Sequence, residues 1–191
     1  MTFTIAFVTG TTPDKWARTW REREKERLEM LPVSEAEQLD GVRSEAVSMA
    51  LVRLPIDPDG LHCIPLYEEQ QVVVVGKDHY LSLADEVTLA ELAEEQLVLP
   101  HPSGWTPTAK QLAWPAMTEK EAIEVAASGG GIAIVPASVA RLHHRKDVVS
   151  RPVADLELTQ VGLAWRVDDD DPRIQTFIGI VRGRTARSSR S

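Results

Sequence analysis

Hydroxyl side chains and a glycine follow the first apolar run of the chain, in a pattern suited to binding an anion. The run Phe3–Val8 is short and apolar and is predicted to be a buried strand. Thr12 is a favourable helix cap, and Pro13 is favoured in a first helical turn. They predict a helix that Thr12 caps and that extends to about Arg27. Unpaired N–H groups at a helix start favour an anion. We therefore predict that this loop lines a ligand site, with capping alone as the alternative: Thr9, Gly10, Thr11 and Thr12.

A further hydroxyl, Ser34, follows the second predicted strand, Leu28–Val33. Ser34 and Glu37 have the spacing of a capping box, which predicts a helix to about Val47. The capping box would occupy the serine side chain, so capping is the alternative to ligand contact. A ligand could still take the neighbouring N–H groups of the helix start.

The segment 101–106 combines hydroxyls with an aromatic ring. Ser103 offers a hydroxyl, Trp105 offers an apolar wall, and Pro102 lies beside them. Such a mixture suits a small carboxylate or an aromatic ligand. The alternative is a surface loop that carries one buried tryptophan.

Three consecutive glycines, residues 129–131, end a predicted helix that begins at the capping box Thr118–Glu121. A helix stop is the favoured interpretation, and close approach of the backbone at Gly130 to a ligand is the alternative. The glycines do not form a phosphate-binding loop, because no Lys-Ser or Lys-Thr pair follows them.

The remaining reactive residue types form no catalytic or metal-binding pattern. His143 and His144 are adjacent, so on a helix they would point to different faces and make a poor metal site. Cys63 lies in an apolar run without a basic neighbour and is predicted to be an inert thiol. Neither a Gly-x-Ser-x-Gly nor a His-Glu-x-x-His motif is present. We predict no catalytic residue, no metal and no cofactor, with an enzyme on a similar scaffold as the alternative.

Composition limits the classes of partner. The 191 residues suit one domain or two small lobes, and a hydrophobic content of 43% is enough for packed cores. The net charge of −8 argues against direct binding to nucleic acid or to anionic membranes. One cysteine, no signal-peptide pattern and no apolar run of about 20 residues predict a soluble, cytoplasmic protein.

The order of predicted elements defines an α/β class. The first 60 residues alternate strand, helix, strand, helix, strand, which predicts a parallel sheet covered by helices. A second box, Thr88–Glu91, predicts a short helix, and a brief strand is expected at Leu97–Leu99. The other predicted strands are Gln71–Gly76, Ile132–Val135 and Val161–Val167, and the other helices are Ser138–His144 and Arg173–Val181.

Five segments, taken in this order, resemble the effector-binding domain of LysR-type transcription regulators. They are Phe3–Gly10, Met49–Glu69, Val72–Leu92, Val125–Pro136 and Gly162–Arg166 with the helix that follows. Together they span residues 3–181. The segment 140–147 and the residues near 179–185 are similar to the stand-alone LysR substrate-binding-domain proteins of actinobacteria.

The resemblance implies two Rossmann-like lobes of periplasmic-binding-protein type, joined by two crossover segments, with a ligand in the cleft between them. Lobe I would hold residues 1–69 and 161–191, lobe II residues 70–160, and residues 183–191 would be a disordered tail. Two departures from the family stand out. No helix-turn-helix precedes the first strand, and the segment 105–118 is short, which predicts a truncated helix there.

The resemblance also implies a role. The chain is expected to bind a small-molecule effector, a small anionic metabolite, and to signal by a change of conformation to a partner or across a dimer. Trp16 and Trp20 share one face of the first helix and are predicted to lie at a homodimer interface, with packing on the sheet as the alternative. A LysR-type regulator is the other expected partner. A fragment of a complete regulator and a degenerate dimerisation module remain as alternatives.

Overall fold

The computed structural model describes residues 2–183. They form two compact units: unit 1 comprises residues 2–67 with residues 160–183, and unit 2 comprises Glu68–Thr159. The chain therefore passes from one unit to the other twice, at residues 67–68 and 159–160. From the sequence, these two crossings are predicted to follow residues 69 and 160. The predicted tail, apart from Gly183, lies outside the described residues.

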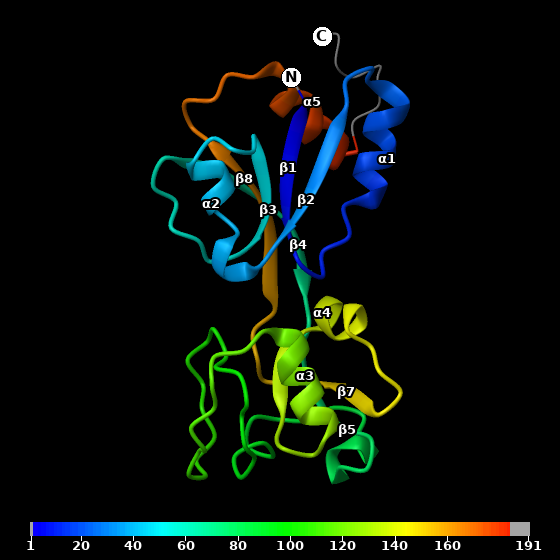
Figure 1. Cartoon of the computed structure of the whole chain (residues 1–191), viewed down its shortest axis with the longest axis vertical. Coiled ribbons are helices and arrows are strands. Elements are labelled where there is room, and N and C mark those ends of the chain that lie inside the picture. The colour runs from blue at the N-terminus through cyan, green and yellow to red at the C-terminus, as the bar shows by residue number, and fades with distance from the viewer. Residues whose placement is uncertain (1, 184–191) are drawn as a thin grey trace. The chain divides into compact units, whose positions relative to one another are not determined.

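Unit 1 is built on a five-stranded sheet in the order β2-β1-β3-β8-β4 (Figure 1). Strand β1 pairs in parallel with β2 on one side and β3 on the other, and β8 runs antiparallel to β3. The strands are β1 (Phe3–Val8), β2 (Leu28–Val33), β3 (Met49–Arg53), β4 (Leu61–Glu69) and β8 (Thr159–Arg166). The predicted strands at residues 3–8 and 28–33 are confirmed to the residue.

Helices cover both faces of this sheet. On one face, α1 (Asp14–Arg23) packs against α5 (Pro172–Val181). Trp20 of α1 stacks on Phe3 of β1 with ring centroids 5.0 Å apart, and Phe177 of α5 meets the same Phe3 ring edge-on. The other face carries the short helix α2 (Asp40–Arg43), whose Val42 is fully buried in a smaller cluster.

Unit 2 contains a three-stranded antiparallel sheet in the order β6-β5-β7. Its central strand β5 (Gln71–Gly76) buries valines on both faces, as expected for a continuous β-branched run. One face packs under α3 (Glu119–Ala127), and the other under the turns of residues 87–97. The remaining elements are the 3-10 turn η2 (Tyr80–Leu83), β6 (Ala133–Pro136), α4 (Ala137–Leu142) and β7 (Val148–Pro152).

The capping box at Thr118 is confirmed in both of its halves. The Thr118 hydroxyl accepts from the Glu121 N–H, and the Glu121 carboxylate accepts from the Thr118 N–H. At the other end of α3, the N–H of Gly130 bonds the carbonyl of Val125, and the N–H of Gly129 bonds that of Ala126. These two bonds form a Schellman motif, which explains the positive φ of 80° at Gly129.

Three other helix predictions were wrong. Helix α1 ends at Arg23, and its cap position is Pro13 without a side-chain cap, so Thr12 does not cap it. After Ser34 the chain forms a 3-10 turn η1 (Glu35–Glu37) and then the short helix α2, in place of one continuous helix, and the Ser34 side chain makes no capping bond to a backbone N–H. The box at Thr88 opens only a series of i→i+3 turns. Residues 97–99 form a single bridge to Ile132 and not a strand.

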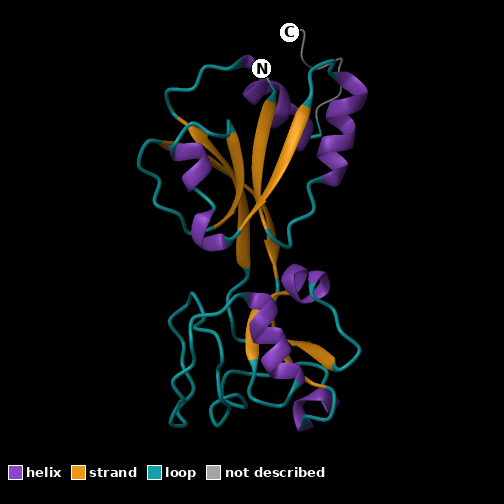
Figure 2. Ribbon diagram, in the orientation of Figure 1, coloured by secondary structure: helices purple, strands orange, loops and turns teal. Residues whose placement is uncertain are grey.

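Residues 99–117 contain no helix or strand, which agrees with the short segment noted in the sequence (Figure 2). Two glutamine side chains hold this loop against the preceding turns. The amide of Gln96 bonds the Lys110 carbonyl and the Leu112 N–H, and the amide of Gln111 bonds the Leu97 N–H and the Glu95 carbonyl. Each glutamine amide thus supplies the backbone hydrogen bonds that a neighbouring strand would otherwise give to the other segment.

The aromatic cluster gives the first test of this fold. Trp20 is 1% exposed and touches Phe3 and Phe177, so Trp20→Ala should destabilise unit 1 by about 3–5 kcal/mol in urea unfolding. Trp16→Ala, at a partly buried position of the same helix, is the matched control and should cost clearly less. Equal losses for the two variants would contradict the packing described.

Candidate functional site

The carboxyl ends of β1 and β3 form a switch point in the sheet of unit 1. After β1 the chain moves to β2 on one side, and then returns to β3 on the other. In open α/β sheets, ligands bind outside the carboxyl ends of the strands at such a point. The residues placed there are Thr9, directly after β1, and Arg53, the last residue of β3.

Arg53 is a buried cation at this edge, with 2% of its surface exposed. Its Nη2 donates to the carbonyl of Thr9 at 2.9 Å, and its Nη1 lies 3.5 Å from the Glu35 carboxylate. Gln38 bonds both the N–H and the carbonyl of Arg53, at 2.8 and 3.1 Å. One side chain therefore joins the ends of β1 and β3 to the turn after β2.

The predicted loop after β1 lies around this arginine. Gly10 has a φ of 93°, a conformation that glycine adopts most readily. The Thr11 hydroxyl is buried and donates to the carbonyl of Val8 at 2.7 Å, so it supports the turn. Thr12 is exposed. Of the three threonines, Thr9 contacts Arg53 directly through its carbonyl, and Thr12 presents its side chain at the surface.

Ser34 lies next to this loop, because the Thr9 N–H donates to the carbonyl of Val33 at 3.0 Å. The serine hydroxyl donates to the Glu37 carboxylate at 2.6 Å. The neighbouring Glu35 is the residue of this turn that faces Arg53. The structure thus brings Thr9, Gly10, Thr11 and Ser34 to one edge of unit 1.

The polar loop of unit 2 is organised around His101. The Nδ1 atom of His101 lies 2.7 Å from the Ser103 hydroxyl, and Nε2 lies 3.4 Å from Oε1 of Gln71 on β5. The Trp105 N–H donates to the Ser103 hydroxyl at 3.2 Å, and the Trp105 ring packs on the core of unit 2. Pro102 is exposed at the turn. Burial lowers the pKa of His101 below its usual value.

Gly130 has a structural role in this arrangement. A Cβ at this position would come within 2.9 Å of the Val125 side chain, and at Gly131 it would lie 2.4 Å from the Gln96 carbonyl. These close approaches, with the Schellman bonds, account for the glycines without a ligand.

Sequence reasoning missed Arg53, Gln38 and Gln71 as site residues. Gln71 was predicted as the first residue of a strand, and Arg53 was named only within the segment Met49–Glu69; the structure places Arg53 at the end of β3 and Gln71 at the start of β5. A usable signal was present, since a charged or amide side chain at the end of a fully buried strand must have a polar partner. Gln38 carried no such signal.

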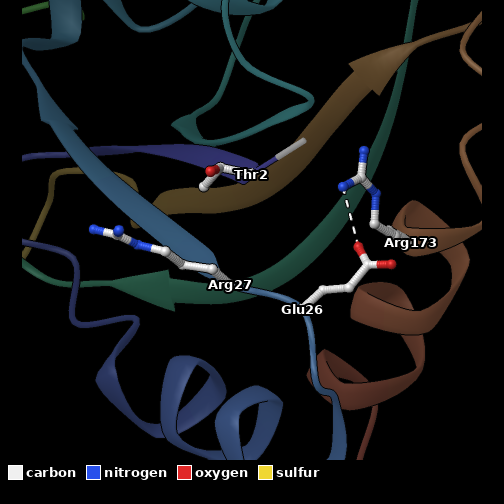
Figure 3. A pocket seen from close by; sticks show the side chains of 4 residues that line it. All are labelled: Thr2, Glu26, Arg27 and Arg173. Carbon is white, nitrogen blue, oxygen red and sulfur yellow. Dashed lines mark hydrogen bonds and ion pairs between the residues drawn. The ribbon is translucent and has the colours of Figure 1, made fainter.

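A surface hollow elsewhere in unit 1 is lined by Thr2, Glu26, Arg27 and Arg173 (Figure 3). Arg173 points at the Glu26 carboxylate, 3.1 Å away, and also pairs with Asp171 at 2.6 Å. Thr2 and Arg27 precede β1 and β2, so this hollow lies at the amino ends of the strands. Arg173 already has two acidic partners. We assign the Arg173–Glu26 ion pair a role in fixing α5 to the sheet.

The two tryptophans of α1 differ in their surroundings. Trp20 belongs to the core of its own unit, and its Nε1 donates to the carbonyl of Glu26 at 2.8 Å. Trp16 is only partly buried against that core. Packing on the sheet therefore accounts for Trp20, and Trp16 alone retains surface for a partner.

The sequence model of the LysR substrate binding domain matches residues 15–186. The chain belongs to this family. Curated relatives include the transcriptional regulator CatR of Pseudomonas putida, 28% identical over 86% of this chain, and the Hca operon activator HcaR of Escherichia coli, 26% identical over 83%. The chain spans 61% and 58% of the length of these two relatives.

Solved structures of LysR-type proteins share the fold. The BenM effector binding domain with its effector benzoate is 21% identical, with a TM-score of 0.77 over 95% of this chain and 90% of that chain. A Corynebacterium glutamicum OxyR mutant is 18% identical, with a TM-score of 0.75 over 96% of this chain and 64% of that chain. The predicted α/β fold with two lobes of periplasmic-binding-protein type is confirmed. Among the described residues, none of the helices could cross a membrane.

The lowered pKa of His101 predicts a pH-dependent stability. Between its unfolded value near 6.5 and its lower folded value, the unfolded chain binds more protons, so the free energy of unfolding should fall as the pH drops below about 6.5. Urea unfolding at several pH values should show this slope in the native protein and a smaller slope in His101→Gln. His144→Gln, at an exposed histidine, is the control. An unchanged slope in His101→Gln would refute the assignment.

Proposed function

We propose that this chain is an effector-binding module of the LysR type that binds a small anionic metabolite and acts in transcription regulation. The buried guanidinium of Arg53 at the sheet switch point is the observation that supports it most directly. The curated relatives are transcription regulators, which supports a role without catalysis. We further propose that the ligand binds at this carboxyl edge of the sheet in unit 1.

The chemistry of Arg53 favours a carboxylate. A guanidinium presents a planar fork of donors that matches the two oxygens of a carboxylate, and it stays charged at all relevant pH values. Its acidic neighbour Glu35 lies at 3.5 Å and is partly exposed, so its side chain can move toward solvent. A ligand carboxylate could then take a place beside Arg53, with Thr9 and Thr12 nearby to contact the rest of the molecule.

Benzoate is the natural first probe, because it is the effector bound by the BenM domain that shares this fold. We propose that binding changes the conformation of the chain, and that the change passes to a second copy or to a LysR-type regulator. In a second copy, the partly exposed Trp16 on α1 would contribute to the interface.

The site assignment is tested by ligand-induced thermal shift. Native mass spectrometry of the purified protein, followed by a screen of benzoate and other small carboxylates, should reveal a ligand that raises the melting temperature. Arg53→Lys keeps the charge but loses the fork of donors, and should weaken binding of that ligand by about tenfold or more.

Arg43→Lys is the matched control. Arg43 pairs with Asp57 at 2.8 Å on the surface of the same unit, so its substitution should leave ligand affinity unchanged. Equal affinity in Arg53→Lys and the native protein would exclude Arg53 from the site. Failure of every carboxylate, together with a clear dimer in the mass spectrum, would favour a dimerisation module without a working effector site.

The dimer proposal has its own test. Trp16→Ala should weaken self-association, because tryptophan contributes strongly to interfaces, and sedimentation equilibrium would measure the change. Leu83→Ala, at an exposed hydrophobic position of unit 2, is the control. A dimerisation constant that Trp16→Ala leaves unchanged would remove α1 from the interface.

A further inference from the structure

The imidazole of His101 is held by hydrogen bonds at both ring nitrogens. Nε2 faces Oε1 of Gln71, and Nδ1 faces both the hydroxyl and the backbone N–H of Ser103. Gln71 is 3% exposed, and its amide nitrogen donates to the Thr159 hydroxyl, which directs Oε1 toward the ring. The histidine side chain therefore has one fixed orientation.

The Ser103 backbone decides the tautomer. A backbone N–H can only donate, and it lies 3.2 Å from Nδ1, so Nδ1 must be an acceptor. The proton of the neutral ring is then on Nε2, where the carbonyl oxygen of Gln71 can accept it. With Nδ1 as an acceptor, the 2.7 Å contact with Ser103 requires that the serine hydroxyl donates.

This polarity limits what Ser103 can offer to a ligand. Its only hydroxyl proton is directed to Nδ1, and its oxygen accepts the Trp105 N–H. What remains at this exposed side chain is a lone pair. A neutral His101 thus makes the loop an acceptor, suited to a hydroxyl, amide or ammonium group of a ligand and not to a carboxylate.

Protonation of His101 reverses the polarity. An imidazolium must donate from Nδ1, so the Ser103 backbone N–H loses this acceptor, the Ser103 oxygen accepts the bond from Nδ1, and the hydroxyl proton is released. The loop then offers an O–H donor beside a positive charge. The ring contacts Gln71 of β5 and Ser103 of its own loop, and both are uncharged. The carboxylate of Glu69, at the end of β4, is bonded to the Ser138 hydroxyl. Burial alone accounts for the lowered pKa of His101.

We propose that His101 sets the ligand preference of the loop 101–105, which accepts a hydrogen-bond donor when the ring is neutral and binds an anion when the ring is protonated. The proposal deepens the proposed function, since it assigns a ligand class to one loop of the effector module. It is independent of Arg53, which lies in unit 1.

The tautomer is tested by long-range proton–nitrogen NMR spectra of the histidine rings, with His101→Gln used to identify the signals of His101. At about pH 8 the ring should be neutral with its proton on Nε2. A proton on Nδ1 at that pH would overturn the proposal, because the serine hydroxyl would then be free to donate.

The change in ligand class is tested with sulfate, a dianion at all the pH values used. Titration should shift the backbone amide signals of residues 103–105 below the pKa of His101, with affinity about tenfold higher than at about pH 8. Ser103→Ala, at an exposed position, keeps the imidazolium and removes the released hydroxyl, so it should lose most of this gain. His101→Gln should show no pH dependence at these signals.

Two results of the sulfate titration would also overturn the proposal. One is equal sulfate affinity at these amides above and below the His101 pKa, and the other is a pH-dependent gain that Ser103→Ala retains in full. Neither depends on finding the effector. If no carboxylate binds in the thermal-shift screen, the sulfate titration still tests the loop 101–105. If the sulfate titration shows no pH dependence, the assignment of Arg53 is unaffected.

Discussion

The need of a buried guanidinium for polar and acidic partners governs the carboxyl edge of unit 1. Arg53 lies inside the protein, where an unpaired charge would cost several kcal/mol, so a partner that leaves must be replaced by another. Those partners are the carbonyl of Thr9, after β1, and the carboxylate of Glu35, after β2. Three strand ends are therefore fixed by one side chain. Under the proposed function, a ligand that competes with Glu35 would break one of the contacts of this turn, while Gln38 would keep the segment joined to β3.

Unit 2 places its polar groups in another way. Its sheet is antiparallel on both sides of β5 and has no switch point where strand ends alone would gather a site. The loop 101–105 is positioned instead by Gln71, the first residue of β5, through His101. Gln71 also bonds Thr159, the last residue of unit 2 before the chain returns to unit 1. The orientation of the histidine ring is thereby tied to the segment through which the chain leaves the unit.

The strands were predictable from the sequence, and the helices only where packing supported them. Short apolar runs bounded by turn residues gave β1, β2 and β5 to the residue, and the runs of β1 and β5 are mostly buried, whereas β2 is a partly exposed edge strand. Three boxes with the same Ser/Thr-x-x-Glu spacing had different outcomes. A capping box satisfies N–H groups of the first helical turn, but it does not offset the free-energy cost of nucleating the helix. A helix therefore also needs an apolar face that packs on the protein. Thr118 is followed by Ala122, Ile123 and Ala126, all buried, whereas Val42 is the one buried residue in the helical turns after Ser34.

The site was predictable only in part, because its central residues are defined by contacts between distant segments. Hydroxyls and glycines beside strand ends identified the loops, but the side chains that fix their polarity, Arg53 and Gln71, belong to strands and were hidden by the apolar pattern around them. These two residues also give the edge of unit 1 and the loop of unit 2 different binding chemistry. Arg53 carries a permanent charge, whereas the loop held by Gln71 is uncharged while His101 is neutral. Under the proposed function, a carboxylate therefore suits the edge of unit 1, and a hydrogen-bond donor suits the loop of unit 2 while His101 is neutral.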